Sequence, residues 1–397
     1  MYILYNMEAM IVSACRTPIG RAGKGALART SAMDLAEIVV AEAVRRSAVP
    51  VDRFDDVILG ESLYGGGDIA RHAAISAGLT GVPGLAVNRH CASGLASVAA
   101  AAAGIRAGMD EAVIAGGVQS SSTSPVSRWR VPGSADAWVD PWMSPTHPPT
   151  PEAPNDDMSI AIGWNTARLA GVSRADMDAW ALRSHQRAVA AIDEGRFLDE
   201  IVPVPLGGGD GVSASQFSVD EQPRRDTSLE KLSALKPLHP EIEAFSITAG
   251  NSCGINDGAA ALVLAGSDLV RREGLEPLAV ITGWASVGID PVRTGLAPVE
   301  AVGKALRRAG VARDDVTLWE INEAFASVAV ACHRLLEIDP ELVNTSGSGC
   351  SLGHPVAATG SRMLTTLVHE LRRRGGGIGV AAMCAGGGQA GAVVVEV

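Results

Sequence analysis

The sequence has few aromatic residues, no dense cluster of positive charge and no long apolar run. Phe, Trp and Tyr make up 4% of the 397 residues, and 33 Lys and Arg stand against 44 Asp and Glu, a net charge of −11. The one cluster of basic residues is Arg372-Arg373-Arg374, so the electrostatic footprint of a nucleic-acid-binding protein is missing. The chain also lacks the ~18 consecutive apolar residues that cross a bilayer. We therefore expect neither nucleic acid nor a membrane as a partner.

The cysteine pattern argues against a zinc site and against a disulfide framework. Six cysteines are scattered without a CxxC pair: Cys15, Cys91, Cys253, Cys332, Cys350 and Cys384. Isolated cysteines in a chain of this size are typical of a reducing compartment, where thiols stay free. The first six residues are apolar but lack the basic region and cleavage site of a signal peptide. We predict a soluble, cytoplasmic protein without a bound metal.

What the chain does contain is 45 glycines and a 47% hydrophobic content, which suits closely packed α/β layers. Expected strands alternate with expected helices, a pattern that predicts parallel strands covered by helices on both faces. This pattern occurs twice, which predicts two copies of one βα unit. The matched segments are residues 10–14 with 279–283, 43–49 with 305–311, Asp55-Asp56-Val57 with Asp314-Asp315-Val316, and 112–117 with 377–387.

The repeats divide the chain into an N-terminal half at 1–119, an inserted domain at 120–250 and a C-terminal half at 251–397 whose strand core begins at about 278. The insert opens with serines and continues with a Pro- and Trp-rich stretch that includes Trp129, Trp138 and Trp142. Two helices are expected next, over 160–170 and 174–194, followed by a Gly-rich charged segment at 207–225. Because insertions on a rigid scaffold commonly carry binding, we predict that this domain covers the substrate.

Cys91 lies between a short apolar strand and a run of strong helix formers. At a helix N-terminus, free backbone N–H groups and the helix dipole favour a thiolate, so the sequence predicts a lowered pKa for Cys91. The same N–H groups could bind an oxyanion. The alternative is a plain packing residue, since free cysteines are among the most buried residue types.

Three later stretches resemble catalytic turns. Asn322 stands at a strand-to-helix transition, where an amide could hold a water or an oxyanion, or could simply cap the helix beside Glu323. His354 lies on a loop before Pro355 and could equally be a surface residue. Cys384 ends a strand before three glycines that permit close backbone approach, and could equally be a buried structural cysteine. Because open α/β folds gather their sites at strand ends, the four groups together suit acyl transfer through a thioester.

These stretches resemble the thiolase family, which comprises acetyl-CoA acetyltransferases and 3-ketoacyl-CoA thiolases. The CxSGL turn at Cys91, the NEAFA stretch at Asn322, the GHP stretch at His354 and the CxGGG stretch at Cys384 stand in family order over nearly the whole chain. Further matches are Arg16-Thr17-Pro18-Ile19-Gly20 and residues 249–260. The resemblance implies a duplicated βαβαβ fold with five α-β-α-β-α layers and an inserted loop domain.

The resemblance also implies the roles of these residues in a condensation that runs reversibly with thiolysis. An acyl-CoA would acylate Cys91 while His354 takes its proton. Cys384 would then remove the α-proton of acetyl-CoA, and the enolate would attack the acyl group on Cys91. His354 and a water on Asn322 would form one oxyanion hole, and the backbone N–H groups of Cys91 and Gly386 the other. Glu323 would orient this machinery without being the base.

Coenzyme A would be substrate and product, and the family mechanism requires no metal or redox cofactor. Arg224 matches the position expected near the nucleotide phosphates, with Arg225 as the neighbouring alternative and solvated loop arginines as the plain one. Ser252 and Cys253 occupy the pantetheine side, where the family usually has Ser at the position of Cys253. Met158 stands in the loop element expected beside the substrate.

Other departures from the family pattern concern the expected substrate wall: Met158-Ser159-Ile160, Ala357-Ala358-Thr359-Gly360, Thr294-Gly295 and the Trp/Pro-rich loop. We therefore expect an acetyl-CoA acetyltransferase of fatty acid metabolism, as a homodimer or homotetramer, and leave the acyl group open. The alternatives are a 3-ketoacyl-CoA thiolase for longer or branched chains, a non-catalytic acyl-CoA-binding protein, and a decarboxylating ketosynthase. The last would normally carry a second His where this chain has Cys384.

Overall fold

The structure is a computed structural model that describes residues 7–62, 64, 68–140, 143–207 and 215–397. The predicted features at residues 1–6, at Trp142 and at 208–214 lie outside the described residues.

Two similar halves are evident in the order of elements. The first half comprises β1 (Ala9–Arg16), α1 (Ala32–Ser47), β3 (Phe54–Gly60), α2 (Asp68–Ser76), β4 (Gly84–Val87), α3 (Ser93–Arg106), β5 (Ala112–Ser120) and β10 (Asn256–Gly266).

Within the described residues, the second half repeats this order without a strand at the place of β4 and with a shorter connection at its end. It comprises β11 (Ala279–Gly288), α8 (Ala297–Ala309), β12 (Val316–Ile321), α9 (Ala326–Leu335), α10 (Gly349–Leu352), α11 (Thr359–Arg373), β13 (Ile378–Ala385) and β14 (Gln389–Glu396). The remaining short elements near the halves are β2 (Gly20–Arg21) and α7 (Ser267–Glu273).

Each half forms a sheet, and the two sheets join edge to edge. The strand order is β12-β13-β14-β11-β1-β10-β5-β3-β4, and the junction is the short antiparallel pairing of Ala9–Ile11 with Ala279–Ile281. The predicted parallel pairing holds for β3 with β4 and β5, and for β12 with β13. It is wrong for β1, β10, β11 and β14, which pair antiparallel, so the sheet is mixed.

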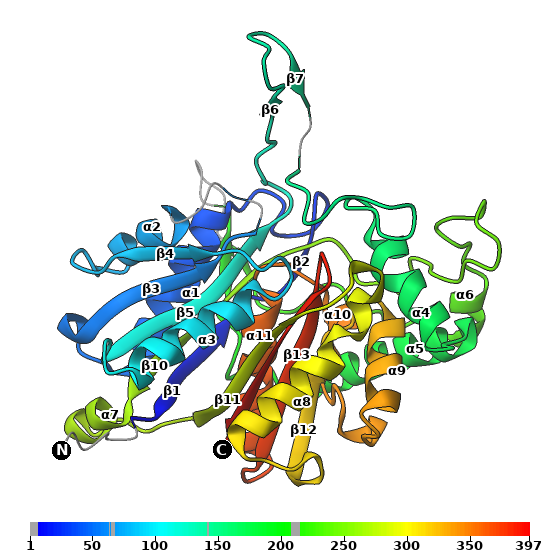
Figure 1. Ribbon diagram of the computed structural model, residues 1–397. Coiled ribbons are helices and arrows are strands. Elements are labelled where there is room, and N and C mark those ends of the chain that lie inside the picture. Colours follow the sequence, from blue (N-terminus) through cyan, green and yellow to red (C-terminus); the bar gives the residue numbers. More distant parts are fainter. Residues whose placement is uncertain (1–6, 63, 65–67, 141–142, 208–214) are drawn as a thin grey trace.

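The helices complete the five predicted layers (Figure 1). α3 and α11 lie between the two sheets, where Leu95, Met363 and Met383 belong to one buried cluster. α1 and α2 cover the outer face of the first sheet, and α8 and α9 cover that of the second. The predicted five-layer duplicated fold is confirmed.

The predicted boundary at residue 251 cuts the first half before its last strand. β10 lies between β1 and β5 in the first sheet, so residues 256–266 belong there and not with the C-terminal half. The insertion therefore separates β5 from β10, whereas a tight turn at residues 386–388 joins the equivalent β13 and β14.

One predicted match between the halves was out of register. In both sheets a register shift follows the first residue of the strand, at Phe54 in β3 and at Val316 in β12. Phe54 therefore corresponds to Val316, and Asp55-Asp56-Val57 lies three residues away from its predicted counterpart. Both segments read Asp-Asp-Val, and this similarity in sequence produced the wrong match.

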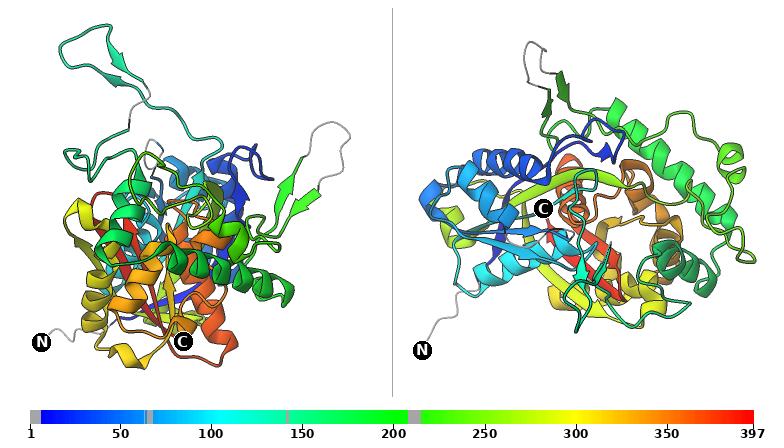
Figure 2. Two further views of the ribbon diagram at one scale, coloured as in Figure 1. Left: turned by 90° about the vertical axis from the view of Figure 1, so that its right-hand side faces the viewer. Right: turned by 90° about the horizontal axis from the view of Figure 1, so that it is seen from above.

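The insertion has two unlike parts. β6 (Trp129–Arg130) and β7 (Trp138–Val139) form an arm that projects away from the body (Figures 1 and 2), so this stretch does not cover the site as predicted. The rest is compact: α4 (Asn165–Leu169), α5 (Arg174–Asp193), β8 (Val204–Leu206), β9 (Ser215–Phe217) and α6 (Leu229–Ser233). α5 packs against α9 and α10 of the second half, which brings the insertion beside the catalytic loops.

Arg16 fastens the insertion to the first half. Its guanidinium, fully buried at the end of β1, binds the carboxylates of Glu200 at 2.6 Å and Asp220 at 2.8 Å. Asp220 also accepts the backbone N–H of Ile19 at 2.7 Å. Breaking such a buried pair leaves an uncompensated charge, so this network accounts for the Arg-Thr-Pro-Ile-Gly motif structurally.

Two helices begin at capping boxes, and α5 starts at the predicted residue 174. Ser31 and Asp34 form a capping box at the start of α1, and Ser173 with Asp176 forms another at α5. Among the described residues, no helix is both long and apolar enough to cross a membrane.

Candidate active site

Cys91 lies in the turn between β4 and α3, as predicted. The preceding residue His90 has a φ of +46°, a conformation that non-glycine residues rarely adopt and that is often found at functional sites. The hydroxyl of Ser93 holds the turn, because it donates to the carbonyl of His90 at 2.6 Å and accepts the backbone N–H of Arg89 at 2.9 Å. The Cys-x-Ser part of the motif therefore fixes the direction of the Cys91 side chain.

The pKa of Cys91 is raised and not lowered as predicted. Burial of the sulfur raises the pKa to about 11. The backbone N–H groups of Gly386 and of Cys91 itself donate to the sulfur and oppose this shift without cancelling it. The sequence argument considered only the local helix terminus, whereas residues from both halves enclose the sulfur. The resting enzyme therefore holds a neutral thiol.

Two glycines allow the helices behind Cys91 and His354 to touch. A Cβ at Gly94 on α3 would lie 2.6 Å from the backbone nitrogen of Ser361 on α11. A Cβ at Gly360 on α11 would lie 2.4 Å from the backbone nitrogen of Leu95. Because neither contact tolerates a side chain, the two helix N-termini meet in the central layer and point their positive ends toward one site.

His354 is buried on the loop that leads into α11. Its backbone N–H donates to Asn256 Oδ1 at 3.0 Å, and its Nδ1 lies 2.7 Å from the hydroxyl of Thr359. Burial, and secondarily the charge of Arg362, lowers the pKa of His354 to about 3. His354 is therefore a neutral imidazole and not a surface residue.

Asn322 faces His354 across the site. Its backbone N–H binds the carbonyl of Ala382 at 3.0 Å, and its Nδ2 lies 3.5 Å from His354 Nε2. Its Oδ1 is buried and has no partner among the described residues. A buried acceptor without a partner is well suited to bind a water, which agrees with the water-holding role and not with a helix cap.

Glu323 is fully buried and accepts four hydrogen bonds. Oε1 accepts from Trp180 Nε1 and Asn344 Nδ2, both at 2.8 Å. Oε2 accepts from the hydroxyl of Ser184 at 2.6 Å and from the backbone N–H of Cys350 at 3.2 Å. With these lone pairs occupied, the carboxylate anchors the loop between β12 and α9 to the insertion, which agrees with an orienting role.

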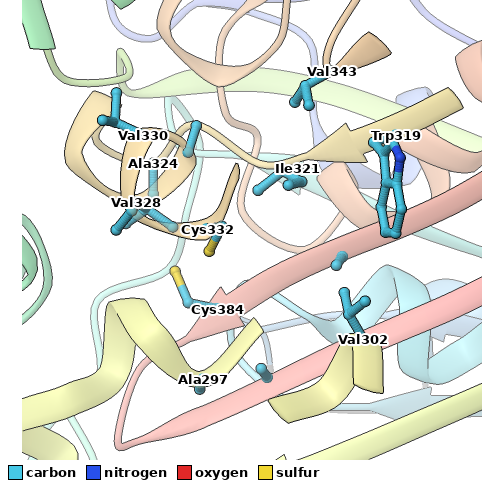
Figure 3. Packing of buried hydrophobic residues seen from close by; sticks show 14 of the residues in the cluster. Ala297, Val302, Trp319, Ile321, Ala324, Val328, Val330, Cys332, Val343 and Cys384 are labelled. Atoms are coloured by element: carbon cyan, nitrogen blue, oxygen red, sulfur yellow. The ribbon is translucent and has the colours of Figure 1, made fainter. Parts of the chain in front are cut away.

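Cys384 ends β13 with its side chain buried in the outer core of the second half. Figure 3 shows its sulfur directed toward Cys332 of α9, among apolar side chains that include Ile321 and Val328. Burial, followed by the proximity of Cys91, Cys332 and Cys253, raises the pKa of Cys384 well above that of a free thiol. It is therefore protonated at rest and close to Cys91.

The glycine turn after Cys384 is held from both sides. Gly387 has a φ of +80°, and a Cβ there would lie 2.6 Å from Thr146 of the insertion. The backbone N–H of Gly388 donates to the hydroxyl of Thr294 at 2.9 Å. Thr294 and Thr359, both assigned to the substrate wall by the sequence, instead support catalytic loops.

Met158 lies beside Gly386, which belongs to the turn that contacts Cys91. Its sulfur and the ring of His90 are the atoms nearest to a Cβ placed on Gly386, at 3.9 and 3.8 Å. Met158, His90 and Thr146 thus surround the turn that contacts Cys91. The sequence prediction missed His90 and Thr146, although the position of His90 directly before the cysteine was a usable signal.

Four residues predicted to bind coenzyme A, or named as alternatives, lie in two segments: Arg224 and Arg225 in the insertion, and Ser252 and Cys253 shortly before β10. The backbone N–H of Cys253 donates to the carbonyl of Ala324, and the hydroxyl of Ser252 to that of Thr248. Arg225 is engaged with Asp193 at 2.6 Å. Arg224 has no ion pair of its own among the described residues, and its backbone N–H donates to His185 Nδ1. Arg224 is therefore the better placed of the two for a phosphate.

The structure thus brings together five chain segments from both halves and the insertion: the turn at 88–93, residues 322–325, residues 252–256, the loop at 353–359 and the turn at 384–388. Among the described residues, no group of three or more His, Cys, Asp or Glu side chains is arranged to hold a metal. Two thiols, a neutral imidazole, an amide and convergent N–H groups define the chemistry of an acyl-transfer centre.

Comparison with known proteins agrees with that class. The sequence matches the family descriptions "Thiolase, N-terminal domain" over residues 9–268 and "Thiolase, C-terminal domain" over 275–397. It is 42% identical to the beta-ketoadipyl-CoA thiolase of Pseudomonas aeruginosa and 40% identical to the 3-ketoacyl-CoA thiolase of Bacillus subtilis, over 98% of this chain and 99% of each relative. The crystal structure of the Bacillus anthracis acetyl-CoA acetyltransferase superposes with a TM-score of 0.87 at 36% identity, covering 98% of both chains.

The chain therefore belongs to the thiolase family and is an acyltransferase.

Proposed function

We propose that this thiolase is an acetyl-CoA acetyltransferase that works through an acyl-Cys91 intermediate. The observation that carries the proposal is the convergence on the Cys91 sulfur of the backbone N–H groups of Gly386 and Cys91, in a site where the helices that follow Cys91 and the neutral His354 touch at Gly94 and Gly360. A binding protein would need neither a second thiol nor an oxyanion hole beside the first. The name of the superposed Bacillus anthracis enzyme supports acetyl-CoA as the substrate.

The first half-reaction is acylation of Cys91. His354 Nε2 takes the thiol proton as the sulfur attacks the thioester carbonyl, and the N–H groups of Cys91 and Gly386 stabilise the negative charge on its oxygen. The protonated imidazole then gives its proton to the departing sulfur of coenzyme A. The raised pKa of Cys91 means that the reactive thiolate forms only during this step.

The second half-reaction forms the carbon–carbon bond. The Cys384 thiol first gives its proton to His354 Nε2, and the resulting thiolate removes the α-proton of a bound acetyl-CoA. The enolate attacks the acyl carbon on Cys91, and the departing Cys91 thiolate takes the proton back from His354. A protonated His354 Nε2 and a water held by Asn322 Oδ1 would donate to the enolate oxygen. In thiolysis the same residues act in reverse, with the Cys384 thiol protonating the departing carbanion. These steps use no metal or redox cofactor.

The proposal is tested by the mass of the intact protein after mixing with acetyl-CoA, followed by turnover with acetoacetyl-CoA and coenzyme A. We expect one acetyl group on Cys91 and rapid thiolysis. An adduct with little turnover would favour a 3-ketoacyl-CoA thiolase for longer or branched chains, whereas no adduct would favour a non-catalytic binder.

Two variants separate the thiols in the same assay. Cys91→Ala should abolish both adduct and turnover. Cys384→Ser should still become acetylated but should lose at least about 100-fold in thiolysis, by the size of general acid–base contributions. If Cys384→Ser folded but were not acetylated, the division of roles between the two thiols would be wrong.

We also propose that the protein assembles as a homotetramer built from dimers, in the cytoplasm. Within the described residues only β3 pairs with the outer strand β4, where Leu85 is 45% exposed, and open strand edges favour pairing with a second chain. The β6–β7 arm exposes Trp138 and Val139, and an isolated two-stranded hairpin is marginally stable in water. The six cysteines, all free, support a reducing compartment.

Sedimentation of the wild type and of Trp138→Ala tests the assembly. The variant should dissociate into dimers if the arm joins dimers. A monomeric wild type at micromolar concentration would contradict both contacts.

A further inference from the structure

The hydrogen bonds around His354 indicate which of its ring nitrogens carries the proton. The hydroxyl of Thr359 lies 2.7 Å from His354 Nδ1 and 2.9 Å from the carbonyl oxygen of Pro355, to which it donates. A hydroxyl has one proton. Because that proton is directed to Pro355, the hydroxyl can only accept from His354, and Nδ1 must carry the hydrogen.

A contact on the opposite side of the ring gives the same assignment. On that side, Asn322 Nδ2 lies 3.5 Å from His354 Nε2. An amide nitrogen donates and does not accept, so it faces a ring nitrogen that has a lone pair. The two contacts come from different chain segments, the start of α11 and the residue after β12, and they agree on one tautomer.

We propose that Thr359 is a positioning residue that holds the proton of His354 on Nδ1 and leaves the Nε2 lone pair free to take the proton of Cys91. The inference rests on the proposed role of His354 as the base. During acylation the S–H bond of Cys91 breaks and an Nε2–H bond forms, and that proton later passes to the sulfur of departing coenzyme A. Thr359 remains bound to Nδ1 throughout.

The chain offers a closely matched control for this residue. Thr365 lies on the same helix and is fully buried, and its hydroxyl also donates to the carbonyl four residues earlier, Ser361, at 3.0 Å. Thr359 and Thr365 therefore differ in one respect that matters here, the contact with His354. Thr359→Val and Thr365→Val remove the same atoms from similar surroundings.

The experiment compares the rate of Cys91 acetylation, by rapid-quench mass spectrometry, in the wild type, Thr359→Val, Thr359→Ser and Thr365→Val. Leaving the buried Nδ1–H without an acceptor should move the proton to Nε2 and slow acetylation about 10- to 100-fold. Thr359→Ser should restore the rate to within a few-fold, and Thr365→Val should behave as the wild type. Equal rates for the two valine variants would overturn the proposal.

The tautomer itself can be read from the nitrogen-15 spectrum of the resting enzyme labelled at histidine, with His354→Asn used for assignment. We expect hydrogen on Nδ1 and a lone pair on Nε2. A proton on Nε2 would overturn the inference even if Thr359→Val did not fold. This measurement needs no substrate, so it separates the inference from the proposed function: a wild type that acetyl-CoA does not acetylate would refute the latter alone.

Discussion

Replacing Glu323 with glutamine tests whether this buried carboxylate orients the site or acts as its base. The amide nitrogen of glutamine must face either Trp180 and Asn344, which both donate, or Ser184 and Cys350. The second choice is the less costly one, because the hydroxyl of Ser184 can turn and accept. The backbone N–H of Cys350 then loses its acceptor.

The expected loss of stability follows from that single orphaned group. An unsatisfied buried N–H costs about 1–3 kcal/mol, and the remaining bonds lose the strength that the charge gives them. We therefore expect Glu323→Gln to lower the free energy of unfolding by about 2–4 kcal/mol, a large part of the stability of an ordinary domain. Since Glu323 does not contact the Cys91 sulfur through any described hydrogen bond, kcat should fall by no more than about tenfold.

Urea unfolding at fixed protein concentration measures the first quantity, and thiolysis of acetoacetyl-CoA the second. Glu341→Gln is the matched control, because the Glu341 side chain is 71% exposed in its ion pair with Arg187 and should cost less than about 1 kcal/mol. A Glu323→Gln variant with wild-type stability and a loss in kcat above about 1000-fold would show that Glu323 takes part in proton transfer.

Three further predictions concern the nucleotide site, the buried imidazole and the glycine turn. Arg224→Ala should raise the KM for coenzyme A about 10- to 100-fold, because a phosphate contact is lost. Arg225→Ala loses only an exposed ion pair and should change this KM little. Equal effects of the two variants on KM would contradict the assignment of Arg224. The pKa of His354 in the folded state is lowered to about 3, so the unfolded chain binds the proton first. This residue therefore lowers the free energy of unfolding as the pH falls below about 6.5, by up to about 1.4 kcal/mol per pH unit. His354→Asn should reduce that pH dependence in acid denaturation. Gly387→Ala should slow acetylation of Cys91 and should lower the free energy of unfolding more than Gly108→Ala. Gly108 has a similar positive φ, but a Cβ there would have no atom within 4 Å. Equal losses of unfolding free energy would mean that backbone strain alone matters.

The sequence was sufficient to place the candidate catalytic residues at turns and strand ends, because short segments determine that placement. A strand, a turn and a helix fix the direction of Cys91, and a strand end fixes Cys384. These local signals survive in the fold, and the family resemblance supplied the order in which they assemble. The roles themselves stay predictions until the variants above are measured.

What the sequence did not reveal depends on contacts between distant segments. The raised pKa of Cys91 comes from enclosure by several loops, which a helix terminus cannot indicate. The resemblance favoured Arg224 with Arg225 as the alternative, but only the structure shows Asp193, 32 residues away, paired with Arg225. Thr359 looked like part of a substrate wall, because its hydrogen bond to His354 depends on how the loop before α11 turns.

The last strand of the first half was also assigned wrongly, for a reason that lies in its pairing. The apolar run at 256–266 follows an insertion of more than 130 residues, and chain proximity favoured the second half. Its partners β1 and β5 are both antiparallel to it, so the expectation of parallel strands gave no reason to place it there. The second half ends in the strand β14, and a matching last strand in the first half was the signal that could have placed residues 256–266.

The duplicated scaffold shows why the first half has no counterpart of Asn322. With Phe54 matched to Val316, position 60 of the first half corresponds to Asn322 and Glu61 to Glu323. Glu61 is buried like Glu323, but position 60 is glycine, and a Cβ there would lie 2.8 Å from Ser93 and 2.9 Å from the carbonyl of Ala357. The turns that present Cys91 and His354 occupy the space that an amide would need. The first half therefore has no counterpart of Asn322, and the proposed nucleophile Cys91 of the first half shares one site with the proposed base His354 of the second.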